Sequence, residues 1–278
     1  MKTILYATDY TDHSLSALQY AYDLSTRIKA ELIILHVFDI PSFSGTLIIS
    51  PLNKTVKRAY AEQNSMIKNY CAKHLGDDFD DNNVRTSVIK HMSVVDGILE
   101  KANSLSADMI IVGIKDENSK RGLLEGDIAK TLITKAPCPL LVIPDKSSAK
   151  QIKHLVYATD FEERDIFAIE KLAHLASPFD AQIHVVHIST KDTEDEESKM
   201  AWFKEMVTQN VNYPNLDFDN LISDSIYDKL NIYLKDKKAD LISLLEREDK
   251  GFLKKLFHRD LVKKVESHTS IPVLSFNS

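Results

Sequence analysis

The sequence predicts an α/β fold made of two tandem domains, each with a parallel five-stranded sheet. Three observations support this prediction: a long internal repeat, apolar residues at helical spacing, and short β-rich runs between the helical segments. The segment 6–10 reads Tyr-Ala-Thr-Asp-Tyr, and 157–161 reads Tyr-Ala-Thr-Asp-Phe, 151 residues later. A repeat of that length is a whole domain and not one unit of a solenoid.

The opening segment of each half is followed by apolar residues at helical spacing. The stripe occupies the same offsets in both halves: Leu15, Leu18, Ala21 and Leu24 in the first, and Ile166, Ile169, Leu172 and Leu175 in the second. Each half also ends on a short apolar run that starts at a proline, at 139–143 and 272–276. The similarity therefore extends well beyond the opening pentapeptide.

Strands and helices alternate along both halves. The first half predicts strands near 2–7, 31–38, 84–90, 107–112 and 139–143, and helices near 12–28, 51–75, 93–105 and 126–135. The second half predicts strands near 153–158, 181–188, 215–222, 239–245 and 271–276, and helices near 163–177, 196–211, 224–237 and 256–268. This alternation is typical of βαβ units, which form a parallel sheet covered on both faces. The short polar segment 145–151 separates a domain 1–145 from a domain 152–278.

The composition predicts a globular protein without a basic footprint. The net charge is −6 and the pI is about 5.9, which argues against nucleic-acid binding and against docking on an anionic membrane. No apolar run is long enough to cross a bilayer, and residues 1–8 resemble a strand rather than a signal peptide. Cys71 and Cys138 show neither metal-site spacing nor a disulfide framework, so we expect a reducing cytoplasm.

One carboxylate follows the first strand of each half: Asp9 in the first and Asp160 in the second. In a doubly wound sheet, ligands bind at the carboxyl ends of the strands, where the strand order reverses. Each carboxylate has two interpretations: a turn or helix-entry residue, or a group that hydrogen-bonds the base or sugar of a nucleotide. Asp12 and His13 beside Asp9 could suggest a metal site, but a turn leading into a helix uses the same residues.

The segment 113–130, after the fourth predicted strand, favours a phosphate site. Three of the seven glycines of the chain lie in it, at Gly113, Gly122 and Gly126. Glycine in a strand-to-helix loop lets backbone N–H groups approach phosphate oxygens. A helix that starts near Asp127 would direct its positive end to the same place.

This loop and the repeated halves resemble the universal stress protein family over nearly the whole chain, as two tandem Rossmann-like domains. The family's nucleotide loop is glycine, two residues, glycine, nine residues, then glycine with serine or threonine. The spacing is kept at Gly113, Asp116, Gly126 and Asp127, but aspartate replaces the glycine at 116 and the hydroxyl residue at 127. The segment 136–142, Ala-Pro-Cys-Pro-Leu-Leu-Val, is also similar to the family.

The resemblance implies a site for an adenine nucleotide, ATP with Mg²⁺, in the first domain. Asp9 and Val37 would border the base and ribose, and the backbones of Gly113 and Gly126 would approach the phosphates. The resemblance also implies that the last strands of the two domains pair, forming an intramolecular pseudo-dimer in which both apolar edges are covered. A homodimer of the whole chain is a further option.

Asp127 weakens the expected nucleotide site. An aspartate is a good helix N-cap, but its own anion fills a position that a neutral serine can share with a phosphate. Two unit charges ~4 Å apart repel by ~4 kcal/mol at an effective dielectric constant of ~20, and a screened fraction of that repulsion costs about one or two decades of affinity. Lys115, Lys120 and Arg121 could offset the repulsion, and Mg²⁺ could bridge carboxylate to phosphate.

The second half departs further from the nucleotide loop. Leu245 stands where the first half has Gly113, Arg259 stands where it has Gly126, and Gly251 is the only glycine in 127–278. Both substitutions place a side chain where the backbone would approach a phosphate, so we expect no nucleotide site in this half. The basic residues of 247–259 are either a solvated helix start or a contact for an acidic partner or anionic ligand.

Three functions follow from these patterns. The first is a stress-response regulatory or binding protein with at most a weak nucleotide site in its first domain. The second is an interaction scaffold that keeps the fold without nucleotide binding. The third, an ATP-hydrolysing enzyme, ranks last because no base, nucleophile or metal set is identifiable. His36 and His187 recur at the end of the second strand, which favours a role in the fold. Trp202 is expected to pack, and the apolar stretch 40–52 either packs or covers a ligand cleft.

Overall fold

The first half of the chain forms five strands and four α-helices within the described residues. The computed structural model describes residues 1–11, 14–40, 52–79, 83–114, 126–145, 147–190, 194–246 and 271–277. The strands of the first half are β1 (Thr3–Ala7), β2 (Glu31–Phe38), β3 (Val84–Lys90), β4 (Met109–Gly113) and β5 (Leu140–Ile143). Its helices are α1 (Leu15–Ile28), α2 (Leu52–Leu75), α3 (Val94–Leu105) and α4 (Gly126–Lys135). These bounds agree with the predicted ones to within about three residues.

The second half repeats the pattern. Its strands are β6 (His154–Ala158), β7 (Gln182–Ser189), β8 (Leu216–Ile222), β9 (Leu241–Glu246) and β10 (Val273–Asn277). Its helices are α5 (Glu163–Ala176), α6 (Glu194–Asn210) and α7 (Ile226–Asp236), and a short 3-10 helix, η3 (Ser177–Phe179), extends α5. The helix predicted near 256–268 lies outside the described residues, as do the basic residues of 247–259. No described helix is both long and apolar enough to span a bilayer.

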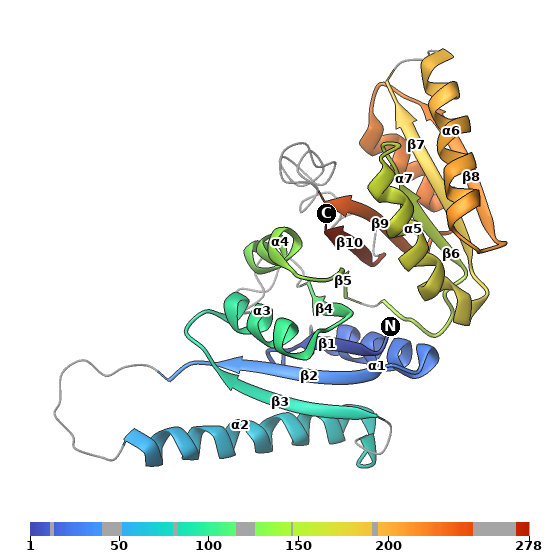
Figure 1. The fold of residues 1–278 in the computed structure, drawn as a ribbon. Coiled ribbons are helices and arrows are strands. Elements are labelled where there is room, and N and C mark those ends of the chain that lie inside the picture. The colour runs from blue at the N-terminus through green and yellow to red at the C-terminus, as the bar shows by residue number, and fades with distance from the viewer. Residues whose placement is uncertain are drawn as a thin grey trace.

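The ten strands form a single sheet in the order β3-β2-β1-β4-β5-β10-β9-β6-β7-β8. Within each half all strand pairs are parallel. The predicted α/β class is therefore confirmed, and the two expected five-stranded sheets are continuous with each other. Figure 1 shows α2 beside β3 at one end of the molecule and α6 beside β8 at the other.

The two halves meet where β5 pairs with β10. This pair is antiparallel, with Leu141 opposite Leu274 and Val142 opposite Val273. The pairing of the last strands is as the family resemblance implied, and it covers two apolar edges that would otherwise invite aggregation. A second contact joins the halves away from the sheet, where Arg27 Nε of α1 donates a hydrogen bond to the carbonyl of Pro178 at 2.9 Å.

Side chains of the strands alternate between two cores. Ile4 and Tyr6 of β1 lie in the core beneath α1 and α2, and this core continues into the second half beneath α5 and α6. Leu5 and Ala7 lie in the core on the opposite face, beneath α3 and α4. Burial on both faces explains why the strand sequences read as continuous apolar runs rather than as alternating ones.

The repeat extends to individual hydrogen bonds. Asp108 Oδ2 accepts bonds from the backbone N–H groups of Lys2 (2.7 Å) and Thr3 (2.9 Å). Asp240 Oδ2 accepts the same two bonds at the start of β6, at 2.7 and 2.9 Å. Positive φ angles also recur at matching positions, for example 64° at Tyr10 and 63° at Phe161. The two halves therefore share turn geometry as well as topology.

Candidate functional site

The candidate site lies at the carboxyl edge of the first half, where the strand order reverses. Strand β1 pairs with β2 on one side and with β4 on the other, which is the place where doubly wound sheets bind ligands. The structure brings three predicted residues to this edge: Asp9 after β1, Val37 in β2, and Gly113 at the end of β4. A hollow beside them is lined by Ala7, Thr8, Asp9, Leu35, His36, Val37, Val94 and Ile98.

Asp9 has a structural role in this edge. Its Oδ1 accepts hydrogen bonds from the backbone N–H of Thr11 (3.1 Å) and from the Thr11 hydroxyl (2.7 Å). This arrangement is a side-chain turn, which is one of the two interpretations drawn from the sequence. The carboxylate is half-buried and also lines the hollow. The structure therefore shows the turn role of Asp9. The contact of Asp9 with a base or ribose stays a prediction.

His36 holds the same turn from the neighbouring strand. Its Nδ1 lies 2.8 Å from the carbonyl of Thr8, and because a carbonyl only accepts, Nδ1 is the donor. Burial lowers the pKa of His36, although the bond to Thr8 and the charge of Asp9 act in the opposite sense. The ring stacks on Tyr10 at 4.1 Å between centroids. His187 makes the same bond to Thr159 at 2.8 Å, so both histidines have the predicted role in the fold.

Val37 forms an apolar wall of the hollow. It also packs closely against Gly97, a residue that the sequence did not indicate as important. The Val37 side chain is buried. A Cβ added at Gly97, in helix α3, would lie 2.8 Å from Val37 Cγ1 and 3.1 Å from His91 Cβ. Gly97 thus lets α3 approach β2. Its signal in the sequence was a glycine inside an amphipathic helix that begins after the cap Ser93.

The phosphate loop is only partly within the described residues. Gly113 is buried at the end of β4, and Gly126 is the first residue of α4. Asp127 is the second residue of that helix, so it lies two positions after the N-cap position, the role that the sequence analysis assigned to it. Asp116, Gly122 and the basic residues of the loop lie outside the described residues.

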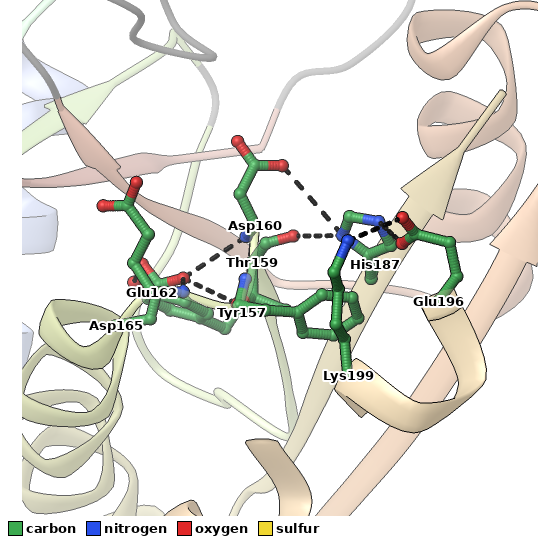
Figure 2. A network of polar contacts seen from close by, with 9 residues as sticks. Tyr157, Thr159, Asp160, Glu162, Asp165, His187, Glu196 and Lys199 are labelled. Atoms are coloured by element: carbon green, nitrogen blue, oxygen red, sulfur yellow. Dashed lines mark hydrogen bonds and ion pairs between the residues drawn. The ribbon is translucent and has the colours of Figure 1, made fainter. Parts of the chain in front are cut away.

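The corresponding edge of the second half holds a buried carboxylate. Asp165 stands where the first half has Ser14, and its side chain is buried. It accepts hydrogen bonds from the Tyr157 hydroxyl (2.8 Å), the Thr159 hydroxyl (2.6 Å) and the backbone N–H groups of Asp160 (3.3 Å) and Glu162 (3.2 Å). Figure 2 shows this network at the end of β6. Asp165 therefore has four donors for its charge.

More acidic groups lie farther along the same edge, around His187 and Lys199. Figure 2 shows His187 between Asp160 and Glu196, with Lys199 beside Glu196. His187 Nε2 lies 3.1 Å from Glu196 Oε2, and Nδ1 lies 4.0 Å from Asp160 Oδ1. Lys199 Nζ lies 2.6 Å from Asp195 and 3.4 Å from Glu196. Within the described residues, this edge therefore presents more carboxylates than cationic groups to any ligand.

Leu245 occupies the place predicted from the sequence. It is buried in β9 and lines the hollow of the second half with Asp160 and Asp165. In the sheet, Ala158 of β6 faces Leu244, as Ala7 of β1 faces Val112. Leu245 therefore matches Gly113, and it places a buried side chain where the first half has none. Arg259, the counterpart of Gly126, lies outside the described residues.

Neither a metal centre nor a reactive thiol is evident in the part of the chain that the structure describes. No group of three or more histidine, cysteine, aspartate or glutamate side chains there could hold a metal ion. Asp12 and His13, which suggested one, lie outside those residues. Burial raises the pKa of Cys71 to about 12 and that of Cys138 to about 11. Both thiols are therefore protonated at neutral pH and are poor nucleophiles.

A family model for universal stress proteins matches residues 1–144. The chain belongs to the universal stress protein family. Two universal stress proteins of Methanocaldococcus jannaschii are similar to it in sequence. One is 26% identical over 149 residues, covering 51% of this chain and 81% of the relative. The other is 27% identical over 163 residues, covering 53% of this chain and 97% of the relative.

Solved structures extend the likeness to both halves of this universal stress protein. A universal stress protein from Archaeoglobus fulgidus superimposes with a TM-score of 0.71 at 14% identity, over 99% of this chain and 98% of the other. A putative universal stress protein from Pseudomonas aeruginosa gives a TM-score of 0.59 at 16% identity, over 100% and 93%. At these identities the likeness concerns the fold, and it covers the second half as well as the first.

Proposed function

We propose that this chain is a regulatory or binding protein of the stress response, with a weak adenine-nucleotide site in its first half and none in its second. The observation that carries the proposal is the difference between Gly113 and Leu245 at the ends of β4 and β9. In the first half the backbone is bare at this position. In the second half a buried leucine side chain takes the space, beside the carboxylates of Asp160 and Asp165.

In the first half, the proposed site uses the edge of the sheet formed by β2, β1 and β4. Val37 supplies an apolar wall for the adenine, and Asp9 accepts a hydrogen bond from the base or the ribose. The N–H groups near Gly113 and at the start of α4 face the phosphates, where the helix dipole favours negative charge. Mg²⁺ bound with ATP would supply charge that offsets Asp116 and Asp127.

The second half is proposed to bind no nucleotide, because its edge repels an anion. Asp165 stands where the first half has Ser14, and Glu196 lies against His187, so this edge carries negative charge in addition to that of Asp160, the counterpart of Asp9. His187 and Lys199 are already engaged with these carboxylates. We infer that this half serves as a partner domain: residues 1–145 and 152–278 would act as a pseudo-dimer joined through β5 and β10.

An interaction scaffold without any nucleotide is the second candidate, and Asp127 favours it. Asp127 is the second residue of α4, and an acidic residue type at the start of a helix disfavours a bound phosphate by charge repulsion. An ATP-hydrolysing enzyme has less support, because the described residues at the edge supply no nucleophile or metal set. The two candidates differ in their affinity for ATP, which can be measured.

Isothermal titration with ATP and Mg²⁺ tests the proposal on the wild-type chain and on Asp127→Ser. We expect weak wild-type binding, at most one nucleotide per chain, and an affinity about tenfold or more higher in Asp127→Ser. Micromolar wild-type binding would overturn the weak site. Two nucleotides per chain would overturn the assignment of the second half. Binding by neither protein would favour the scaffold, and steady ATP turnover lost in Asp9→Asn would favour the enzyme.

A further inference from the structure

Helix α2 is strongly basic, although the chain as a whole has a net charge of −6. Its lysine and arginine side chains are all exposed: Lys54, Lys57, Arg58, Lys68 and Lys73. Glu62 is the one acidic residue in the bounds of the helix, and it pairs with Arg58 at 2.8 Å. The four lysines form no ion pair with any other described residue. This helix therefore presents unneutralised positive charge.

Local helix stability does not explain the positive charge near the start of α2. Lys54, Lys57 and Arg58 lie in the first two turns, and the first turn contains no acidic residue. The N-terminal end of a helix is its positive end, so each cation there is unfavourable by roughly 0.3–1 kcal/mol at low salt. A negatively charged surface placed against these turns would remove that repulsion.

This part of α2 is also available for docking. The helix has 24 residues, about 36 Å, whereas β3 has 7 residues, about 23 Å. The helix is therefore about 13 Å longer than the strand. Among the described residues, the side chains of 54–64 are exposed or half-buried, and the fully buried ones of this helix come later, at Ile67, Tyr70 and Cys71.

Helix α6 occupies the equivalent place in the second half and has the opposite charge. Its acidic residues are Glu194, Asp195, Glu196, Glu197 and Glu205, against Lys199 and Lys204. The neighbouring edge strand β8 adds Asp217, whose side chain is 58% exposed. Acidic residues in the first turn also stabilise α6 itself, so their excess has a partly local cause. Figure 1 shows α2 and α6 at opposite ends of the molecule.

Each of these two helices also exposes one large apolar side chain. Met66 of α2 is 49% exposed, and Trp202 of α6 is 42% exposed, contrary to the expectation that Trp202 packs. Tryptophan is enriched among the residues that contribute most to protein interfaces, and methionine makes favourable contacts with aromatic rings. The two helix faces are therefore complementary in charge, and each offers an apolar anchor.

We propose that the α6 face of one copy of this chain docks on the α2 face of a second copy. The α2 face consists of Lys54, Lys57, Arg58, Met66 and Lys68, and the α6 face of Asp195, Glu197, Trp202 and Glu205. Because the two faces differ, the contact is head-to-tail, and it adds further copies until a ring closes. Charge pairs at a surface steer association and weaken with salt. We infer a reversible assembly that salt dissociates.

Two variants test the proposal, one for each face. Lys54→Glu/Lys57→Glu removes the positive face, and it adds acidic residues to the start of α2, where they stabilise the helix. Glu197→Lys/Glu205→Lys removes the negative face. Glu163→Lys/Glu170→Lys is the matched control, because it reverses one first-turn and one later exposed glutamate on α5. Circular dichroism checks that each variant is folded.

Sedimentation velocity and the fluorescence of Trp202, the single tryptophan, are measured at low salt and at about 0.5 M salt. We expect concentration-dependent assembly of the wild type and the control at low salt, with at least a tenfold weaker association at high salt. Each face variant alone stays monomeric. An equimolar mixture of the two restores association, because the intact negative face of one variant meets the intact positive face of the other. A wild type that is monomeric at low salt, or a mixture that stays monomeric, overturns the proposal.

Discussion

Gly97 of helix α3 lies against Val37 of strand β2 so closely that a Cβ at position 97 would be 2.8 Å from Val37 Cγ1. Contacts between real side chains do not reach this distance, so one of the two elements would have to shift. His91 Cβ, at 3.1 Å, restricts movement on another side. The same valine is proposed to border the adenine, so the packing of α3 and the shape of the candidate site depend on one glycine.

Gly97→Ala is therefore expected to destabilise the protein. An alanine in a helix interior normally gains up to about 1 kcal/mol over glycine, but overpacking costs about 1–3 kcal/mol. We expect a net loss of about 1–2 kcal/mol in the free energy of unfolding, measured by urea denaturation. Ser104→Ala, at an exposed position of the same helix, is the control and should change stability little.

The double variant Gly97→Ala/Val37→Ala identifies the cause of that loss. Val37→Ala removes the methyl group that the new Cβ would meet, so the second substitution should cost less in the Gly97→Ala background than in the wild type. A coupling of about 1 kcal/mol or more is expected for groups in direct contact. Additive effects of the two substitutions would contradict the proposed contact.

Much of the fold was predictable because its cause is local in the sequence. Apolar runs at β2 and β7 and helical stripes at α1 and α5 reflect burial on two faces of a parallel sheet. The recurring His36 and His187 indicated a shared role, and both bind the carbonyl after β1 or β6. The turn role of Asp9 was one of two interpretations, since a carboxylate in that place suits a turn and a ligand equally.

Other features depend on contacts between distant segments. Glycine is needed at position 97 because α3 packs closely on β2. No local sequence pattern shows which helix approaches which strand most closely. Asp165 looks like an ordinary first-turn acid of α5, and its burial appears only when Tyr157 and Thr159 are placed over it. Trp202 was expected to pack because large aromatic side chains usually do, but α6 lies at the end of the sheet and its outer face has no described neighbour to cover it.

Protonation of His36 is expected to reduce stability in mild acid. Burial lowers the pKa of His36 in the folded chain below its ordinary value of 6.5, and burial together with the nearby Lys237 lowers that of His184. At pH values between the lowered pKa of each folded histidine and 6.5, the unfolded chain therefore binds more protons than the folded one. The contribution to stability is full above pH 6.5 and is lost as the pH falls through the folded pKa, by at most about 1.4 kcal/mol per pH unit for each histidine.

Urea denaturation of the wild type and of His36→Gln between pH 7.5 and 5 measures this effect. The free energy of unfolding of the wild type should fall with decreasing pH, and that of His36→Gln should fall less steeply. The difference between the two curves isolates His36 from the other histidines. Parallel curves would show that His36 takes up its proton equally in the folded and unfolded chains.

Substitution of Asp165 is expected to lower the stability of the protein much more than substitution of Glu163 in the same helical turn. Its carboxylate satisfies two hydroxyl groups and two backbone N–H groups in a buried place, so Asp165→Ala would leave several donors without an acceptor. Removing a charged partner from buried donors is costly, and we expect a loss of about 2–4 kcal/mol in the free energy of unfolding. Glu163→Ala, an exposed position in the same first turn, should lose only a few tenths of a kcal/mol.

Asp165→Ser tests whether stability depends on the carboxylate charge or only on a polar side chain at this position. A serine at 165 reproduces the first half, where the Ser14 hydroxyl lies 3.1 Å from the Thr8 hydroxyl and the Ser14 carbonyl accepts from the Tyr6 hydroxyl at 2.7 Å. Since Tyr157 and Thr159 match Tyr6 and Thr8, the serine should recover part of the stability that alanine loses. Equal losses for serine and alanine would show that the second half needs the carboxylate itself, and that its turn is no longer interchangeable with that of the first.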